Sequence, residues 1–232
     1  MISNKKVAVV IPSRYKSSRF PGKPLVDILG KPMVVRVADL SAKAVGEENV
    51  YVATDDKRIG DVVEEHGYNV IYTSDECLTG TDRVAEASLK IDADVIVNVQ
   101  GDEALLDPND IIKAVSCKIN RDLMYVSRNA IPSSKTGIVK SAHKQICIYA
   151  FTKGQLKDYY DIGKKNGKTP VEASEDIEII RFLEMGVKVK MVEVEGGTLA
   201  VDFPEDVKEV EKIFRKQQLY SKLDSKVKTG IR

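Results

Sequence analysis

The feature that most constrains the fold is a short apolar run near the amino terminus that ends at a basic loop. Residues 7–12 read VAVVIP, and such a continuous run, rich in β-branched residues, is typical of a strand buried in a parallel sheet. In open α/β sheets, ligands bind beyond the carboxyl ends of the strands, where this loop begins. The loop carries three cations, two hydroxyls, a glycine and two prolines: Arg14, Arg19, Lys23, Ser17, Ser18, Gly22, Pro21 and Pro24. We therefore predict a polyphosphate-binding loop, the alternative being a solvated basic loop.

The next hundred residues alternate strand and helix patterns, as expected of a doubly wound sheet. The predicted strands cover residues 7–12, 50–54, 69–72 and 94–99, and the predicted helices cover residues 32–45, 57–66 and 82–90. Pro32 suits a first helical turn, because its missing N–H would have no partner there. Asp107 precedes Pro108 and is predicted to cap a fourth helix. Right-handed crossovers then bring the strands into one mostly parallel sheet.

The second half is predicted to extend this sheet rather than to form an independent domain. Strand patterns cover residues 123–128, 145–151 and 187–194, and helical patterns cover residues 171–185 and 204–217. Residues 131–142 and 163–168 are rich in Ser, Lys and Gly and are predicted as loops, the first of them mobile. The last dozen residues are polar and basic and are predicted to be frayed.

The composition excludes several functions. A formal net charge of +1 and 6% aromatic residues give no argument for a nucleic-acid-binding module. No run approaches 18 apolar residues and the N-terminal MISNKK does not resemble a signal peptide, so we expect no membrane partner and a cytoplasmic protein. Two histidines argue against a histidine-rich metal site or a Ser-His-Asp triad, and three cysteines without a C-x-x-C pair suit a reducing compartment.

Two aspartates follow apolar runs, and the first of them, Asp102, is a candidate metal ligand. Residues 95–99 read VIVNV and lead into Gln100, Gly101 and Asp102, where the glycine permits a tight turn. A carboxylate beside a triphosphate is what Mg²⁺ needs, because magnesium prefers hard oxygen ligands. The alternative is an ordinary turn aspartate. Asp202 is predicted to end a short strand before a proline-started helix, where the alternative is an ordinary N-cap.

A third stretch, LTGTDR over residues 78–83, places a Gly-Thr turn at the start of a helix. The backbone N–H groups and hydroxyls of such a turn can bind a base edge or a phosphate. The alternative is that Thr79, Gly80 and Thr81 only cap the helix.

Together these motifs resemble the sugar nucleotidyltransferases that activate sugar acids with CTP, and in particular the 3-deoxy-manno-octulosonate (Kdo) cytidylyltransferase family. Residues 14–24 match its R-x-x-S-x-R-x-P-G-K-P signature. Residues 98–104 match N-V-Q-G-D-E-P except at Ala104, and residues 78–83 resemble its S-G-T-D/E-R segment, with Cys77 where a histidine is usual. Residues 200–207 resemble G-V-D-T-P-E-D-L. The resemblance spans roughly residues 5–215.

The resemblance implies a fold and a reaction. The fold is an α/β, nucleotide-diphospho-sugar transferase-like three-layer sandwich with a mixed, mostly parallel central sheet. Residues 1–232 form a single domain, with a nucleotide-binding half over 5–120, a sugar-acid and dimerisation half over 121–217 and a basic tail over 218–232. The reaction couples CTP to a 3-deoxy-2-ulosonic acid, releasing pyrophosphate, in a homodimer.

The resemblance also implies roles for individual residues. Arg14, Lys23, Asp102 and Asp202 are the catalytic set, and Asp102 and Asp202 hold Mg²⁺. The nucleotide is bound by Arg14, Ser17, Arg19, Lys23, Thr79, Gly80, Thr81, Arg83 and Gln100. The sugar acid is bound by Gln100, Arg128, Gln145, Tyr149, Glu172 and Glu175.

The match weakens on the sugar side. Gln145 stands where the family has a histidine, and Ile179 where it has a glutamine. Glu172, Glu175 and Glu178 recur every three residues on roughly one helix face, the alternative being a solvated acidic face. The acceptor is therefore Kdo or a different acid, such as an 8-amino-Kdo analogue, another nonulosonic acid or a phosphonate. A non-catalytic nucleotide-binding relative is the remaining alternative.

Overall fold

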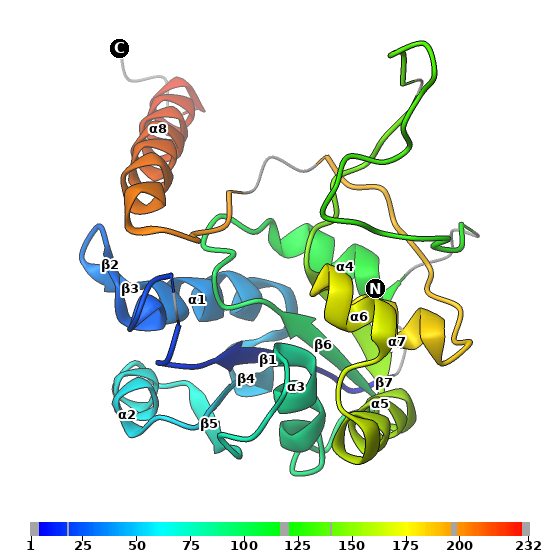
Figure 1. Ribbon diagram of the computed structural model, residues 1–232. Helices are drawn as coiled ribbons and strands as arrows, with labels where there is room; N and C mark the ends of the chain where they lie inside the picture. Colours follow the sequence, from blue (N-terminus) through cyan, green and yellow to red (C-terminus); the bar gives the residue numbers. More distant parts are fainter. Residues whose placement is uncertain (1–4, 18, 117–120, 140, 196–198, 229–232) are drawn as a thin grey trace.

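A five-stranded sheet in the order β5-β4-β1-β6-β7 forms the centre of the protein (Figure 1). The computed structural model describes the chain except for residues 1–4, 18, 117–120, 140, 196–198 and 229–232. The strands are β1 (Val7–Ser13), β4 (Val50–Thr54), β5 (Asn69–Tyr72), β6 (Val95–Val99) and β7 (Ile148–Thr152). The first four run parallel and β7 pairs antiparallel with β6. The predicted mixed, mostly parallel sheet is confirmed.

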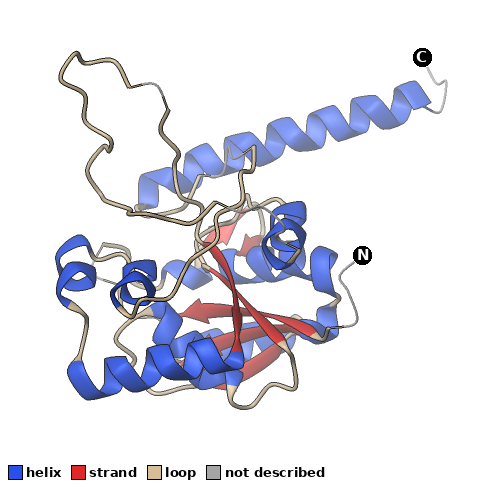
Figure 2. Cartoon of the chain, turned by 90° about the vertical axis from the view of Figure 1, so that its right-hand side faces the viewer, coloured by secondary structure: helices blue, strands red, loops and turns tan. Residues whose placement is uncertain are grey.

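Helices cover both faces of the sheet and make three layers (Figures 1 and 2). One face packs against α1 (Met33–Val45), α2 (Lys57–Glu65) and α4 (Pro108–Val115), and the other against α3 (Gly80–Ser88), α5 (Lys153–Asn166) and α7 (Ile179–Glu184). The alternation along β1 explains the division, because successive side chains of a strand point to opposite faces. Val7, Val9 and Ile11 join the first core, while Ala8 and Val10 join the second.

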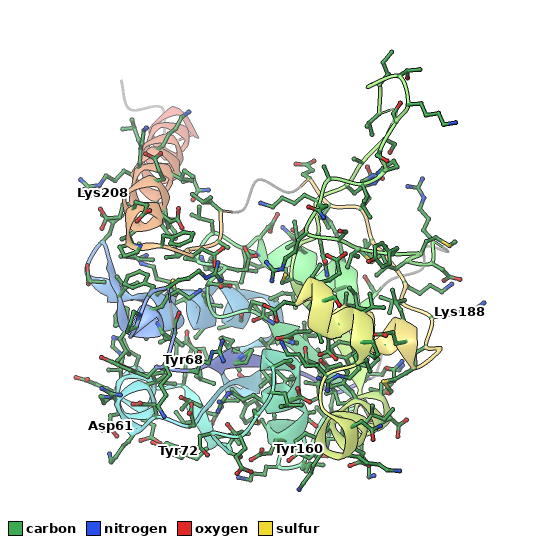
Figure 3. The ribbon with its side chains drawn as sticks, viewed as in Figure 1. Asp61, Tyr68, Tyr72, Tyr160, Lys188 and Lys208 are labelled. Carbon is green, nitrogen blue, oxygen red and sulfur yellow. The ribbon has the colours of Figure 1, made fainter. Side chains whose placement is uncertain are left out.

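Local sequence signals begin the helices of the first half as predicted. The Asp107 carboxylate accepts from the Asn109 N–H at 2.9 Å and caps α4, and Asp56 caps α2 through the Arg58 N–H. The helix predicted from Pro32 begins one residue later, with Pro32 in the two-residue strand β3 (Lys31–Pro32), paired with β2 (Asp27–Ile28). In Figure 3, Tyr68 lies at the α1 side of the sheet, where its hydroxyl donates to Asp39 at 2.8 Å.

The second half differs from its prediction in several places. The predicted strands over residues 123–128 and 187–194 are absent, and only an isolated bridge between Asp122 and Lys190 joins these segments. Most of residues 123–147 instead form a long excursion away from the sandwich (Figure 2), although Leu123 and Val126 pack against the second core. No sheet strand lies beside these residues, so their backbone N–H and C=O groups have no neighbouring strand with which to pair. The strand predicted over residues 145–151 is confirmed as β7, shifted to Ile148–Thr152.

Three helical predictions also need correction. The loop predicted over residues 163–168 belongs mostly to α5, which starts with a capping box at Thr152 and runs to Asn166. The single helix predicted over residues 171–185 is two helices, α6 (Pro170–Glu175) and α7, which are separated by a left-handed residue at Asp176. The three glutamates predicted to share one face therefore do not.

The last helix, α8 (Pro204–Lys228), is longer than predicted and extends through most of the segment expected to be frayed. Residues 229–232 of that segment lie outside the described chain. The first turns of α8 pack on a third apolar cluster, which contains Ile28, Met33, Ala104, Val201 and Val210. The described residues directly before Asp202, 199–201, form no strand, contrary to the prediction. No helix in the described part of the chain is long and apolar enough to cross a membrane.

Candidate active site

A cavity of about 250 Å³ opens at the carboxyl ends of β1 and β6. Its lining includes Asp102 and most of the residues predicted to bind a nucleotide: Arg14, Ser17, Arg19, Lys23, Thr79, Gly80, Arg83 and Gln100. A larger hollow of about 470 Å³ lies at the opposite edge of the sheet, where Lys6 pairs with Asp92. None of the predicted site residues lines that hollow. Since ligands of α/β sheets bind at the carboxyl edge, the smaller cavity is the candidate site.

The two predicted metal-binding aspartates converge on one lysine. The Lys23 ammonium donates to Asp102 Oδ2 at 2.7 Å and to the Val201 carbonyl at 2.9 Å, and it lies 4.0 Å from Asp202 Oδ1. The Val201 N–H in turn donates to the Asp102 carbonyl at 3.1 Å. This pair of backbone and side-chain bonds joins the segment after β6 to the segment before α8. Residues 100 positions apart in the sequence therefore meet at one point.

The basic loop is held in shape by a glycine and an aromatic ring. Gly22 has φ +72°, and a Cβ there would lie 3.2 Å from the Tyr15 ring. The Gly22 N–H donates to the Tyr15 carbonyl at 2.9 Å and closes the loop. Ser17 Oγ accepts from the Phe20 N–H at 3.3 Å, and Arg19 pairs with Asp202 at 2.9 Å. The predicted Ser18 lies outside the described residues.

The start of α3 is capped, and a carboxylate occupies it. Thr79 is the N-cap and accepts from the Asp82 N–H at 3.1 Å, which confirms the capping alternative for this residue. The Glu178 carboxylate accepts from the N–H groups of Gly80 and Thr81 at 2.7 and 2.9 Å, and from the Thr81 hydroxyl. In this structure Glu178 thus occupies the backbone groups that were predicted to bind a nucleotide. Burial raises the pKa of Glu178, although these hydrogen bonds oppose the shift.

Arg83 and Gln100 also belong to the cavity wall. Arg83 is almost fully buried, and its guanidinium pairs with Asp55 at 3.2 Å and donates to the Thr73 hydroxyl. These partners fix Arg83 below the cavity rather than leaving it extended into solvent. Gln100 is half-buried and follows β6 directly, as the motif predicts.

The residues predicted to bind the sugar acid divide into three groups. Glu172 lines the cavity but is fully buried, and both of its oxygens are bound by Arg181 at 2.7 Å, so in this structure its carboxylate belongs to an internal ion pair. Glu175 accepts from the N–H of Arg128 at 2.9 Å and from the hydroxyls of Tyr125 and Ser127.

The third group is the pair on and before β7. Gln145 donates to the Tyr149 hydroxyl at 2.6 Å, and neither residue lines the cavity. Arg128 and Glu175 do not line it either. The structure therefore brings together the nucleotide side of the predicted site, and leaves these four acceptor-side residues outside its wall.

The departures from the family motifs fall in different environments. Cys77 lines the cavity, and burial raises the pKa of its thiol to about 12. Ile179 is 2% exposed and packs in the second core, where it offers no polar group to a ligand. Ala104 is fully buried in the third cluster below Asp102. Only Cys77 of the three therefore lies in the cavity wall.

The carboxylate pair suits a magnesium ion that shares its ligands with a substrate. Within the described residues, no group of three His, Cys, Asp or Glu side chains could hold a metal alone. Asp102 and Asp202 both reach one cation, and their side chains are 26% and 42% exposed, so they remain accessible. Magnesium commonly takes one or two carboxylates together with phosphate oxygens. Asp102 and Asp202 fit that requirement.

Sequence analysis missed three charged residues that line the cavity beside the predicted set: Lys168, Asp176 and Glu178. The continuous helix predicted over residues 171–185 concealed the last two, because it placed Asp176 and Glu178 in regular helical positions. Asp176 is instead the left-handed residue that ends α6, with φ 50° and ψ 45°. No local signal in the sequence indicates that break.

Comparisons with known proteins agree with this geometry. Residues 8–225 match the family described as Cytidylyltransferase. A mitochondrial 3-deoxy-manno-octulosonate cytidylyltransferase from Arabidopsis thaliana is 36% identical over 92% of this chain and 85% of its own. The protein of that name from Geobacter metallireducens is 35% identical over 91% of this chain and 99% of its own.

Solved structures that resemble this chain also include nucleotidyltransferases. A CMP:2-keto-3-deoxy-manno-octonic acid synthetase complexed with CTP superposes with a TM-score of 0.80 at 30% identity, over 91% of this chain and 99% of its own. A nucleotidyl transferase from Methanothermobacter thermautotroptrophicus shares the fold, with a TM-score of 0.66 at 15% identity over 91% of this chain and 99% of its own.

Proposed function

The chain belongs to the cytidylyltransferase family, among the 3-deoxy-manno-octulosonate cytidylyltransferases, and from that premise we propose that it couples CTP to Kdo. As a member of this family it is a nucleotidyltransferase. In the proposed reaction the anomeric hydroxyl oxygen of Kdo bonds to the α-phosphorus of CTP. The bond from that phosphorus to the bridging oxygen of pyrophosphate breaks, and the hydroxyl proton passes to solvent. The products are CMP-Kdo and pyrophosphate.

The observation that carries the proposal is the meeting of cations and carboxylates at one edge of the sheet. Arg14, Arg19 and Lys23 come from the loop after β1, and Asp102 comes from the turn after β6. A site that transfers a phosphoryl group needs cations for the phosphate charge and hard oxygen ligands for a metal. Few other reactions need both sets on one cavity wall.

The cations of the loop have distinct environments and hence distinct tasks. The Arg14 side chain is exposed at the cavity, where it can reach the terminal phosphates. Arg19 is half-exposed and Lys23 is 16% exposed. Lys23 is the least solvated of the three, so its charge acts most strongly on phosphate oxygens during bond breaking. Ser17 and Gln100 add polar groups to the same wall.

Magnesium is part of the proposal. Asp102 and Asp202 would hold it, and when bound it would neutralise phosphate charge and acidify a coordinated hydroxyl. In the structure, the Lys23 ammonium neutralises these two carboxylates. Lys23 therefore keeps two acidic groups close together until they acquire other positive charge.

A different acceptor is the second candidate, favoured by the position of Cys77 in the cavity wall. A thiol there replaces the family's histidine, and neither Gln145 nor Ile179 lines the cavity. An 8-amino-Kdo analogue, another nonulosonic acid or a phosphonate would be activated by the same nucleotide-side residues. We also propose that the enzyme is a homodimer.

The test is pyrophosphate release from CTP and Mg²⁺ with Kdo, with 8-amino-Kdo and sialic acid assayed in parallel. Turnover with Kdo at least about tenfold faster than with the other acids supports the proposed acceptor. Turnover with only one of the others replaces Kdo by that acid. If CTP binds but none of the acids releases pyrophosphate, the proposed reaction is wrong and the non-catalytic alternative gains support.

A further inference from the structure

Lys168 and Asp176 form an ion pair in the cavity wall that the family motifs do not include. Lys168 lies two residues before α6, and Asp176 is the residue at which α6 ends (Figure 1). Its backbone is left-handed, which is uncommon for a residue other than glycine. This conformation ends α6 beside the cavity and places the carboxylate within reach of cations from other segments.

One carboxylate, that of Asp176, is shared by two cations. Lys168 Nζ lies 2.5 Å from Oδ1, and Arg128 Nη2 lies 3.2 Å from Oδ2. Arg128 comes from the excursion after residue 121, so two distant segments contribute the two charges. Lys168 and Arg128 are thus close enough to bind both oxygens of a single carboxylate group. The hydrogen bond from Lys168 lowers the pKa of Asp176, and the charges of Arg128 and of Arg14, which lines the same cavity, add to this effect.

Arg128 is also held in place by hydrogen bonds other than its ion pair with Asp176 Oδ2. Its backbone N–H donates to Glu175 Oε2 at 2.9 Å, and its Nε donates to the Glu175 carbonyl at 2.6 Å. These bonds orient the guanidinium toward the end of α6. The guanidinium is therefore already ordered before a carboxylate binds.

The contacts of Asp176 are exchangeable. The side chain of Asp176 is 64% exposed and that of Arg128 is 59% exposed, while Lys168 is 30% exposed. Ion pairs at such exposure contribute little net stability, because water solvates the separated charges well. A second carboxylate can thus compete with Asp176 for these cations at small cost. Arg14 lines the same cavity as Lys168 and Asp176 and supplies a further cation there.

We propose that Lys168 and Arg128 together bind the carboxylate of the acceptor acid, and that Asp176 is an internal competitor for the same two cations. The inference rests on the proposed function, since it concerns the acid that receives CMP. It adds Lys168 as a residue that determines acceptor affinity. Asp176 then weakens acceptor binding rather than supporting it.

The test compares Lys168→Met with Asp176→Asn. Asparagine tolerates the left-handed conformation as aspartate does, so the second change removes the charge and keeps the turn. Lys165→Met is the matched control, because Lys165 is an exposed lysine of α5 that does not line the cavity. Binding of Kdo and of sialic acid is measured by isothermal titration, with a CTP analogue bound whose α and β phosphorus atoms are joined by methylene.

Lys168→Met is expected to weaken binding of the acid about fivefold, in line with a partly exposed charge pair. It should leave the dissociation constant of the CTP analogue within about twofold. Asp176→Asn is expected to strengthen binding of the acid, and Lys165→Met to leave both constants unchanged. A purely structural ion pair would instead make the first two changes act in the same direction.

Three results overturn the inference. If Lys168→Met and Asp176→Asn both weaken binding of the acid, the Lys168–Asp176 ion pair has only a structural role. If Lys168→Met changes only the dissociation constant of the CTP analogue, Lys168 binds the triphosphate instead of the acid. Failure of wild-type protein to bind either acid removes the carboxylate site altogether. The proposed function fails separately, when wild-type protein binds CTP and an acid but releases no pyrophosphate.

Discussion

At the scale of single residues, the ammonium of Lys23 decides how the site is assembled. The ammonium neutralises Asp102 at 2.7 Å and lies 4.0 Å from Asp202. It therefore allows two carboxylates that would otherwise repel each other to lie close together. The same side chain bonds the Val201 carbonyl and thus joins the two segments that carry the aspartates. Lys23, which we propose to bind phosphate, thus also holds together the two proposed metal ligands.

Asp102→Asn tests the role of this carboxylate in turnover. We expect kcat with CTP, Mg²⁺ and the acceptor to fall about 100-fold or more, because a neutral amide binds a divalent cation weakly. The free energy of unfolding should change by less than about 1 kcal/mol, since Asp102 is partly exposed. Steady-state kinetics and thermal unfolding on the same preparation measure both.

Asp107→Asn is the matched control for that variant. Asp107 also follows β6 and caps α4, and asparagine caps a helix about as well as aspartate. Its turnover should stay close to wild type. Near-normal turnover in Asp102→Asn would remove the metal assignment, whatever the control shows.

At the scale of elements, a buried arginine joins three helices below the cavity. Arg181 of α7 is fully buried and binds Asp82 of α3 and Glu172 of α6, each at 2.7 Å. The Tyr159 ring of α5 lies 3.8 Å from its guanidinium. Removing one partner of a buried pair leaves an unpaired charge, which costs about 3–5 kcal/mol. The start of α3, and with it the cavity wall, depends on this network.

Gly163→Ala should break the network by sterics alone. A Cβ at Gly163 would lie 2.3 Å from Arg181 Nη1 and 2.9 Å from Asp82 Oδ1, and Arg181 is held too firmly to move aside. We expect a loss of about 3 kcal/mol in the free energy of unfolding. Gly154→Ala on the same helix has only Thr152 Oγ1 near, at 4.0 Å, and should be neutral or slightly stabilising. Equal denaturation midpoints for the two variants would contradict this account.

Glu184 links α7 to the start of α6 and should give a pH-dependent contribution. Its carboxylate accepts from the N–H groups of Val171 and Glu172 at 3.0 and 3.1 Å, and from the Thr169 hydroxyl. Burial raises the pKa of Glu184, but these hydrogen bonds outweigh it and the net shift is downward. A carboxyl group whose pKa is lower in the folded state adds stability above its unfolded value. That stability is lost as the pH falls through the folded pKa.

Glu184→Gln should therefore destabilise the protein by about 0.5 kcal/mol at pH 7, a small amount because the carboxylate is exposed. The difference from wild type should shrink below pH 4 and vanish once Glu184 is protonated. Urea unfolding at several pH values measures it, with the exposed Glu65→Gln as the control. A difference that stays constant with pH would show that the carboxylate charge contributes nothing.

At the scale of the whole molecule, the excursion over residues 123–147 lies mostly outside the sandwich, with Leu123 and Val126 packed against its second core. Large apolar side chains of this excursion face solvent, with Met124 90% and Ile138 72% exposed. Figure 3 shows part of this segment, with its side chains, extending away from the sheet and the helices, while Tyr125 and Ser127 bond Glu175 of α6. Clusters of exposed apolar residues on an extended segment are typical of protein interfaces. This is the surface we expect to form the proposed homodimer.

Light scattering after size exclusion should give the mass of two chains, because burying these side chains against a second copy removes apolar area from water. The double variant Met124→Glu, Ile138→Lys should shift the mass toward that of one chain. Leu89→Lys is the control, since Leu89 is 66% exposed at the end of α3, away from the excursion. A single-chain mass for the wild-type protein would end the dimer proposal.

The sequence by itself determined the first half of the fold and most of the nucleotide side of the site. The apolar strands, the caps at Asp56 and Asp107 and the glycine of the basic loop act through neighbours a few residues away. Each such signal is complete within a short segment. Because parallel strands end at one edge, the order of the elements also predicted that the loop after β1 and Asp102 would meet.

Only the tertiary structure decided the acceptor side. Three features of this side depend on segments distant in the sequence. They are the end of α6 at Asp176, the burial of Glu172 against Arg181 and the hydrogen bonds from the start of α3 to Glu178. The same holds for Lys168 and Arg128, which share one carboxylate across 40 residues. A helical pattern is local, but the energy of a buried charge depends on the partners that folding supplies. For that reason the sequence predicted which residues are charged here, and the structure alone decided what each charge binds.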